Sequence, residues 1–191
     1  MPTSVHPTTP APILRADARR NRARLLDVAH QAFLAHGVGA SMDEIARQAG
    51  VGIGTLYRHF PTRDDLIVEL AAADLERLAV AADDAGAEPA AVERWLESLV
   101  EHNLTYRGLA DSIVAARGRP TALGAACDRI HAAGEAMVAR AQGRGDLRDD
   151  VRPGDVIDLA VAVAWVTEGD ADDRRRRDLL RVALDGLRAG R

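Results

Sequence analysis

Cysteine and aromatic residues are scarce in this sequence, and lysine is absent. Its 191 residues include one cysteine, Cys127, and six aromatic side chains, while all 25 positive residues are arginines. A single cysteine excludes an internal disulfide and a cysteine-rich zinc site. The few aromatic residues among abundant Ala and Leu favour helices over a β-sandwich. We interpret the exclusive use of arginine as a bias toward GC-rich codons and not as a functional signal.

Long apolar runs are also missing. The longest is LAVAVAWV, at residues 159–166, which is far shorter than a membrane span. The first residues, MPTSVHPTTPAPILR, lack the charged start and apolar core of a signal peptide. We therefore expect a cytoplasmic protein with no membrane partner. Four of the eight prolines lie within residues 1–13, and we expect residues 1–15 to form a disordered tail.

The charges are distributed unevenly along the chain. Residues 1–63 hold eight arginines against four acidic residues, whereas residues 64–191 hold 17 arginines against 25 acidic residues. A basic N-terminal segment followed by an acidic remainder suggests that the first part binds a polyanion and the second does not. Small imbalances also arise by chance, so this interpretation needs a motif to support it.

Helical periodicity runs through the sequence, and no segment has the alternation of a strand. Glycines and prolines mark the breaks between the periodic segments. We predict an all-α protein with helices over residues 17–36, 42–49, 53–60, 62–85, around Trp95, 121–144, 154–168 and 173–189, and a short helix or two turns over 106–117.

Two of the predicted helices form a helix-turn-helix pattern. Ser41 and Glu44 have the spacing of a capping box, which predicts that the first helix starts at Met42. Gly50 makes the turn and Ala46 is small enough for close crossing. We expect the second helix to turn Val51, Leu56 and Phe60 inward. Its outward side chains are then Ile53, Gly54, Thr55, Tyr57, Arg58 and His59.

These outward residues have the chemistry of nucleic-acid contacts. Gly54 lets the backbone approach a groove wall, and the hydroxyls of Thr55 and Tyr57 suit phosphate oxygens. Arg58 and His59 can reach the backbone or base edges. The alternative for Tyr57 is a half-buried packing role.

The segment AGVGIGTLYRHFPTRDDL, preceded by SMDEIARQ and by RARLLDVAHQAF, strongly resembles the tetracycline-repressor-like (TetR) family of bacterial transcription regulators. That family's pattern is roughly T-x-x-x-I-A-x-x-A-G-V-S-x-G-T-L-Y-x-H-F-x-x-K-x-x-L, and the match covers about residues 20–70. Gly52 stands where the family usually has Ser, which costs a helix N-cap only a few tenths of a kcal/mol. Arg63 stands where the family usually has Lys, and arginine can also bind phosphate.

The resemblance implies a helix-turn-helix DNA-binding domain over residues 16–63 and a helical ligand-binding and dimerisation domain over residues 64–191. It implies a homodimer that represses transcription on double-stranded operator DNA and is released by a small-molecule ligand. The DNA-binding residues that it implies are Ser41, Gly54, Thr55, Tyr57, Arg58, His59 and Arg63. The arginines at 19, 20, 22 and 24 form either a solvated helix face or a basic arm near phosphates.

Polar side chains continue the apolar stripe that Trp95 and Leu99 begin. Such groups either line a ligand cavity or are hydrogen-bonded residues of the core. Cys127 and His131 share a helix face four residues apart, but no third ligand is visible, so we expect no metal site. The residues that we predict to line a pocket are Trp95, Leu99, His102, Asn103, Tyr106, Cys127, His131 and Trp165.

The sequence shows no nucleophile–base pair, metal cluster or phosphate loop, so we expect neither catalysis nor a cofactor. The G-x-G of Gly52 and Gly54 is not a dinucleotide fingerprint, because the third glycine is missing and no strand precedes it. A rival interpretation is a helical small-molecule-binding or enzymatic protein whose DNA-binding head is vestigial. The basic N-terminal segment and the intact LYRHF argue against it.

The predicted helix over residues 154–168 is apolar around most of its circumference, which indicates burial on several sides. With Leu180, Leu184 and Leu187 of the last helix, it predicts a four-helix interface about a two-fold axis. Ala160 and Ala164 would permit close approach in that interface. The alternative is that this helix is the buried centre of a monomer.

Overall fold

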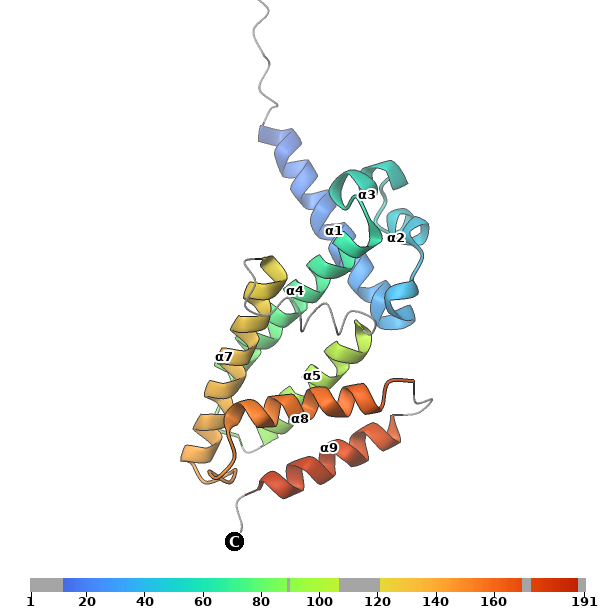
Figure 1. Cartoon of the computed structure of the whole chain (residues 1–191). Helices are drawn as coiled ribbons and strands as arrows, with labels where there is room; N and C mark the ends of the chain where they lie inside the picture. The colour runs from blue at the N-terminus through green and yellow to red at the C-terminus, as the bar shows by residue number, and fades with distance from the viewer. Residues whose placement is uncertain (1–11, 89, 107–120, 170–172, 189–191) are drawn as a thin grey trace, which may run out of the picture. The chain divides into compact units, whose positions relative to one another are not determined.

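The computed structural model describes residues 12–88, 90–106, 121–169 and 173–188, and these residues are almost entirely helical (Figure 1). The chain divides into two compact units, residues 1–66 and 67–191, which we call the head and the body. Among the described residues, β pairing is limited to one isolated bridge between Leu147 and Arg188. The all-α prediction is therefore confirmed.

The head begins with α1 (Pro12–His36), followed by the 3-10 helix η1 (Gly37–Gly39), α2 (Met42–Gln48) and α3 (Ile53–His59). α1 starts before residue 17 and inside the predicted tail, because proline is tolerated in the first turn of a helix, where its missing N–H costs nothing. The rest of that tail, residues 1–11, lies outside the described residues.

The helix α4 (Arg63–Asp83) starts in the head with the predicted cap. The backbone N–H and the hydroxyl of Thr62 both donate to the Asp65 carboxylate, at 2.9 and 2.8 Å, and the Asp65 N–H donates back to the Thr62 hydroxyl at 3.1 Å. These reciprocal bonds pair donors that the first turn of a helix otherwise leaves exposed. The start of α4 is therefore set locally.

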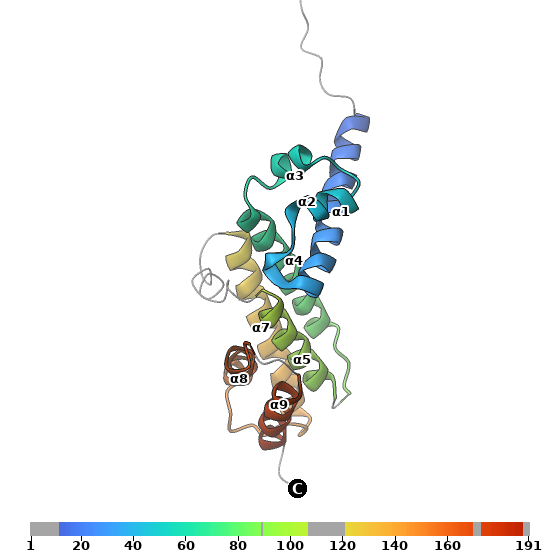
Figure 2. The same ribbon diagram turned by 90° about the vertical axis from the view of Figure 1, so that its right-hand side faces the viewer.

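The body contains most of α4 together with α5 (Ala90–Thr105), α7 (Ala122–Gly143), α8 (Pro153–Val166) and α9 (Arg174–Leu187). α8 packs on α5 and α7, and α9 lies beside α8 in both views (Figures 1 and 2). At the centre a Cβ on Gly134 would lie 2.5 Å from Cη2 of Trp95, so α7 approaches α5 at a glycine. No helix within the described residues is long and apolar enough to span a bilayer.

A buried hydrogen bond ties the end of α5 to α4. The hydroxyl of Tyr106, which is fully buried, donates to the Asp74 carboxylate at 2.6 Å, and Arg77 pairs with the same carboxylate. Burial, with Asp74 as a further cause, raises the pKa of Tyr106 above its ordinary value of 10.0. Since the folded state favours the neutral phenol, this contribution to stability is present below about pH 10 and is lost as the pH rises above it. The short helix or turns predicted beyond Tyr106 fall on residues 107–120, outside the described residues.

Tyr106→Phe should lower the free energy of unfolding by about 1–3 kcal/mol, because it removes one of the partners of the buried Asp74 carboxylate. For a chain of this size, each kcal/mol corresponds to about 2–4 °C in Tm. Thermal unfolding followed by circular dichroism measures the change. Tyr57→Phe is the matched control, because the Tyr57 side chain is exposed and its hydroxyl has no partner within the described structure. Equal Tm values for the two variants would contradict a stabilising role for the Tyr106 bond.

Candidate nucleic-acid interface and ligand cavity

The turn between α2 and α3 depends on Gly50. Its φ of 67° lies in the left-handed region that favours glycine, and the next N–H, that of Val51, donates to the Ala46 carbonyl at 3.0 Å. Ser41 caps α2, since its hydroxyl accepts from the Glu44 N–H at 3.4 Å. The capping box is only half formed. The Glu44 side chain accepts instead from Arg47 and Gln48, and the bonds from Arg47 lower its pKa to about 2.

The inner face of α3 is fixed by the core of the head. Leu56 and Phe60 are fully buried, as predicted, whereas Val51 is only half-buried. The Arg22 guanidinium lies 5.3 Å from the centroid of the Phe60 ring, a cation–π geometry. Of the four arginines considered as a basic arm, Arg22 thus packs on α3, and Arg24 donates to Asn21 at 2.8 Å. The side chain at position 19 lies outside the described structure.

The outer face of α3 is open. Tyr57 is 45% exposed, Arg58 is exposed, and Arg58 donates to the Thr55 hydroxyl at 3.0 Å. A Cβ on Gly54 would meet nothing within 4 Å, and the Gly54 φ lies outside the left-handed region. The fold of the head therefore gives no reason for a glycine at this position. A glycine would be required here if another molecule had to approach the α3 backbone closely.

Two of the expected DNA contacts also have roles within the head. Arg63 is half-buried, and its guanidinium donates to the Ala40 carbonyl at 2.6 Å. This bond joins the start of α4 to the residue before the α2 cap. The Ser41 hydroxyl oxygen accepts the capping bond, which leaves its hydrogen to donate outward. His59 is half-buried, with its ring 6.3 Å from that of Phe60.

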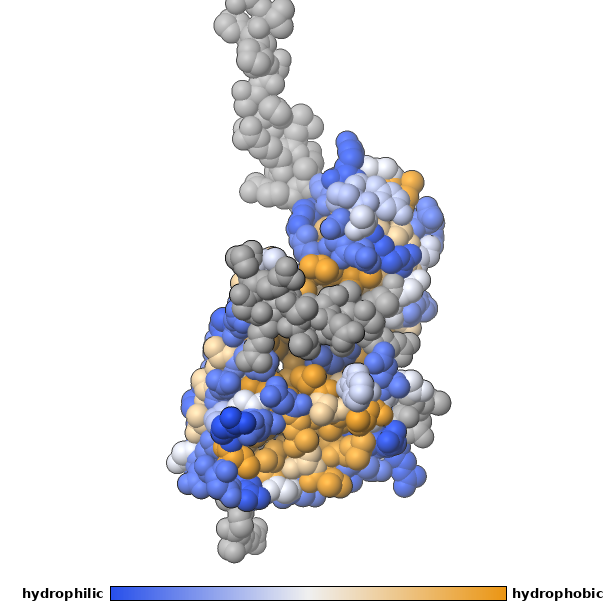
Figure 3. Space-filling view, viewed as in Figure 1, coloured by the Kyte–Doolittle hydropathy of each residue, from blue (hydrophilic) through white to orange (hydrophobic). Residues whose placement is uncertain are grey.

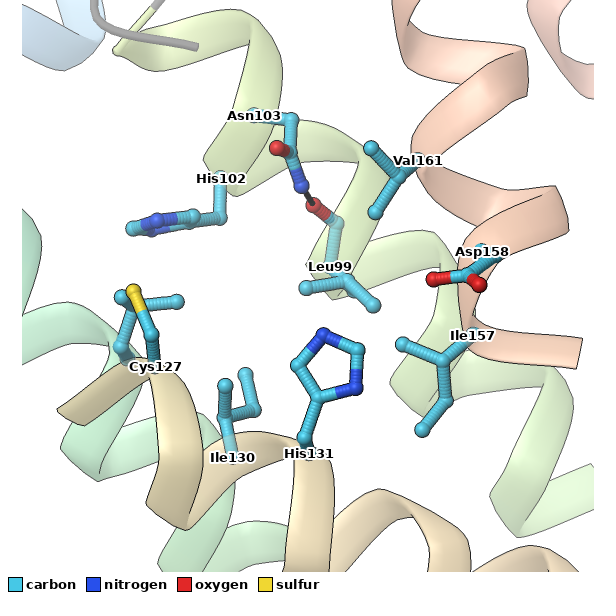
Figure 4. A pocket seen from close by; sticks show the side chains of 10 residues that line it. Leu99, His102, Asn103, Cys127, Ile130, His131, Ile157, Asp158 and Val161 are labelled. Carbon is cyan, nitrogen blue, oxygen red and sulfur yellow. Dashed lines mark hydrogen bonds between the residues drawn. The ribbon is translucent and has the colours of Figure 1, made fainter. Parts of the chain in front are cut away.

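The body contains a cavity of about 190 Å³ between α4, α5, α7 and α8 (Figure 4). Five of the eight predicted pocket residues lie on its wall, namely Leu99, His102, Asn103, Cys127 and His131. The remaining wall residues, which were not predicted, are Leu75, Ile130, Ile157, Asp158 and Val161. Asp158 could have been predicted from the sequence, because it is the one acidic residue inside the apolar run from Val156 to Val166.

The other three predicted pocket residues lie elsewhere. Trp95 is buried and packs against Gly134, and its indole N–H donates to the Leu78 carbonyl at 2.8 Å. The ring of Tyr106 contacts that of His102 at a tilt of 51°, with ring centroids 4.9 Å apart, and its hydroxyl donates to Asp74. Trp165 is 71% exposed on α8. Trp95 is therefore a core residue that also borders a separate pocket between α4, α5 and α7, Tyr106 is a core residue, and Trp165 is a surface residue.

An apolar stripe on α8 is exposed to solvent, and apolar residues gather over α8 and α9 in the space-filling view (Figure 3). The stripe consists of Leu159, Ala162, Trp165 and Val166, and Val182 of α9 is 71% exposed. Ala160 and Ala164 are buried in the body, as are Leu180, Leu184 and Leu187 of α9. The expectation that these five face a partner chain is therefore wrong, because they pack α8 and α9 onto their own subunit.

Among the described residues, no group of three or more His, Cys, Asp or Glu side chains is arranged to hold a metal ion. Cys127 is buried and lies on the cavity wall with His131, from the same helix (Figure 4).

Comparisons with known proteins agree with this architecture. A family model described as bacterial regulatory proteins, tetR family, matches residues 25–70, and one described as transcriptional regulator SbtR-like, C-terminal domain, matches residues 88–189. HTH-type transcriptional regulators from several Staphylococcus aureus strains are 44% identical over 64 residues, a match that spans 33% of this chain and 35% of each relative. The match thus spans about a third of the length of these curated relatives.

Two solved structures match over most of the chain. A TetR transcriptional regulator from Streptomyces coelicolor is 31% identical with a TM-score of 0.70, over 89% of this chain and 99% of its own. A TetR transcription regulatory protein from Mycobacterium vanbaalenii is 37% identical with a TM-score of 0.65, over 92% of this chain and 99% of its own. The fold and the site thus define a helix-turn-helix transcriptional regulator with a helical body. The chain belongs to the tetR family of bacterial regulatory proteins.

Proposed function

We propose that this regulator binds operator DNA in the cytoplasm as a homodimer, represses transcription, and releases the DNA when a small molecule occupies the body cavity. The observation that supports DNA binding most directly is the outer face of α3. There Gly54, which has free space around it, lies beside the exposed side chains of Tyr57 and Arg58, while the inner face of the helix is fully buried. The residues proposed to contact DNA are Ser41, Gly54, Thr55, Tyr57, Arg58, His59 and Arg63.

Ligand release needs a molecule that binds one state of the dimer better than another, because only differential affinity shifts an equilibrium. The cavity of about 190 Å³ in the body gives such a molecule a place. A gel shift with the DNA upstream of the protein's own gene separates this function from a small-molecule-binding or enzymatic protein with a vestigial head. A specific band supports the proposal, and the lack of one at any protein concentration favours the rival.

Two variants of α3 should separate neutral from charged DNA contacts. Tyr57→Phe should weaken binding to all sequences by about 1 kcal/mol, roughly fivefold, and leave the salt dependence unchanged, because it removes one neutral hydrogen bond. Arg58→Gln should lower the slope of log K against log salt by about one unit per head, because it removes one cation from a phosphate. Fluorescence anisotropy at several salt concentrations measures both effects. If the Arg58→Gln protein keeps the DNA affinity and the salt slope of the wild type, Arg58 does not contact DNA.

A further inference from the structure

The volume of the body cavity matches a molecule of about one ring. An engineered protein cavity of about 150 Å³ binds benzene, and this cavity measures about 190 Å³. Its walls include the buried apolar side chains of Leu75, Leu99, Ile130 and Ile157. The space therefore suits one ring with a short chain.

The exposed side of the cavity carries a carboxylate, that of Asp158 on α8. Asp158 lines the cavity from α8 and is exposed, and it has no ion-pair partner within the described structure. The nearby cation Arg152 interacts with Asp158 through charge alone, because its guanidinium donates its hydrogen bonds to Asp155, at 3.0 and 2.8 Å. The charge on Asp158 thus remains available to a ligand.

A second acceptor lies on α5. The Asn103 side-chain nitrogen donates to the Leu99 carbonyl at 2.8 Å, as the dashed line in Figure 4 shows. Because that bond fixes the orientation of the amide, its oxygen is the end left to accept a hydrogen bond. The imidazoles of His102 and His131 add hydrogen-bonding groups but no fixed charge. No arginine lies among the described wall residues, and the chain has no lysine.

We propose that the cavity binds a small amphiphilic cation, an ammonium group on a short chain carrying one apolar ring, with the ring between the apolar walls and the ammonium at Asp158. Among the described wall residues a carboxylate ligand would meet no arginine or lysine, and it would lie beside the Asp158 charge, which costs affinity. This proposal rests on the proposed function, since it takes the cavity to be the effector site.

The test compares three molecules that share one ring and a chain of similar length: 2-phenylethylamine, 2-phenylethanol and 3-phenylpropionate. Isothermal titration of the full chain should give the ammonium compound about 10- to 100-fold tighter binding than the alcohol, as expected for a hydrogen bond to a charged group, and the weakest binding for the carboxylate. Asp158→Asn should remove the preference for the ammonium compound, and Asp158→Glu should retain it. Asp149→Asn is the matched control, because Asp149 is an exposed carboxylate of the body that does not lie on the cavity wall.

Binding of the carboxylate as tight as that of the amine would overturn the proposal. So would an undiminished amine preference in Asp158→Asn, or the failure of the amine to bind the wild type at millimolar concentration. Operator binding by the wild type without any of these molecules tests the proposed function separately. If the protein binds its operator but not the amine, only the proposed ligand class is wrong. If the protein binds no DNA, the proposed function is wrong.

Discussion

Ala162→Arg should convert the proposed dimer into a monomer and lower operator affinity by about 10²- to 10⁴-fold. Ala162 lies in the middle of the exposed apolar stripe on α8, between Leu159 and Trp165. A two-fold axis through this stripe would place the two copies of residue 162 close together, so an arginine there would bring two like charges into an apolar contact. Linking two heads raises avidity by about 10²- to 10⁴-fold, and this gain disappears with the dimer.

The matched control is Ala136→Arg. Ala136 is an exposed helical alanine on α7, away from the stripe, so the same substitution there should leave both assembly and operator affinity unchanged. Ala160 is unsuitable for this test, because it is buried within the body and an arginine there would unfold the subunit. Light scattering at micromolar concentration reports the mass, and gel shift reports the affinity. A wild type that is already monomeric, or an Ala162→Arg protein that remains dimeric, would exclude the stripe as the interface.

Gly54→Leu should lower operator affinity by about 100-fold without lowering the stability of the head. No atom lies within 4 Å of a Cβ at this position, and leucine is a better helix former than glycine, so the fold should tolerate the change. On DNA, the leucine side chain would hold α3 away from the groove and weaken several contacts at once. Since each mismatched base pair costs about 1–3 kcal/mol, a loss of about 3 kcal/mol, or about 100-fold, is reasonable for such a displacement.

Gly143→Leu is the control for this substitution. Gly143 is also helical and uncrowded, but it ends α7 in the body, where we propose no DNA contact. Its operator affinity should equal that of the wild type. Unchanged operator affinity in Gly54→Leu would show that α3 does not approach DNA at this residue. A large fall in Tm would show instead that the fold does require the glycine.

The helix-turn-helix could be predicted from the sequence because its determinants are local. The hydroxyl of Ser41, the left-handed angle at Gly50 and the reciprocal bonds of Thr62 and Asp65 each depend on residues no more than five positions apart. The apolar spacing of Leu56 and Phe60 then fixes which side of α3 is buried. Arg63 shows the limit of such reasoning, since its bond to Ala40 spans 23 residues.

The cavity could be predicted only in part, because its wall depends on which helices meet. The part of the α5 stripe that lines the cavity consists of Leu99, His102 and Asn103. The same stripe extends beyond the cavity at both ends, so Trp95 and Tyr106 contact Leu78 and Asp74 of α4 instead. Only the tertiary packing determines which residues of such a stripe line the cavity and which belong to the core.

The orientation of α8 could not be predicted, because apolar residues occupy several sides of this helix. Its periodicity does not distinguish Ala160, which faces the core, from Ala162, which faces solvent. The packing of α8 on α5 and α7 makes that choice, and it also places Trp165 on the surface.

Selection from a random-sequence DNA library with the purified protein shows whether two copies of this chain bind DNA together. A dimer with two-fold symmetry should enrich a roughly palindromic site, with half-sites whose centres lie about one helical turn, or a multiple of it, apart. Enrichment of a single half-site, or of no sequence at any protein concentration, would contradict the account.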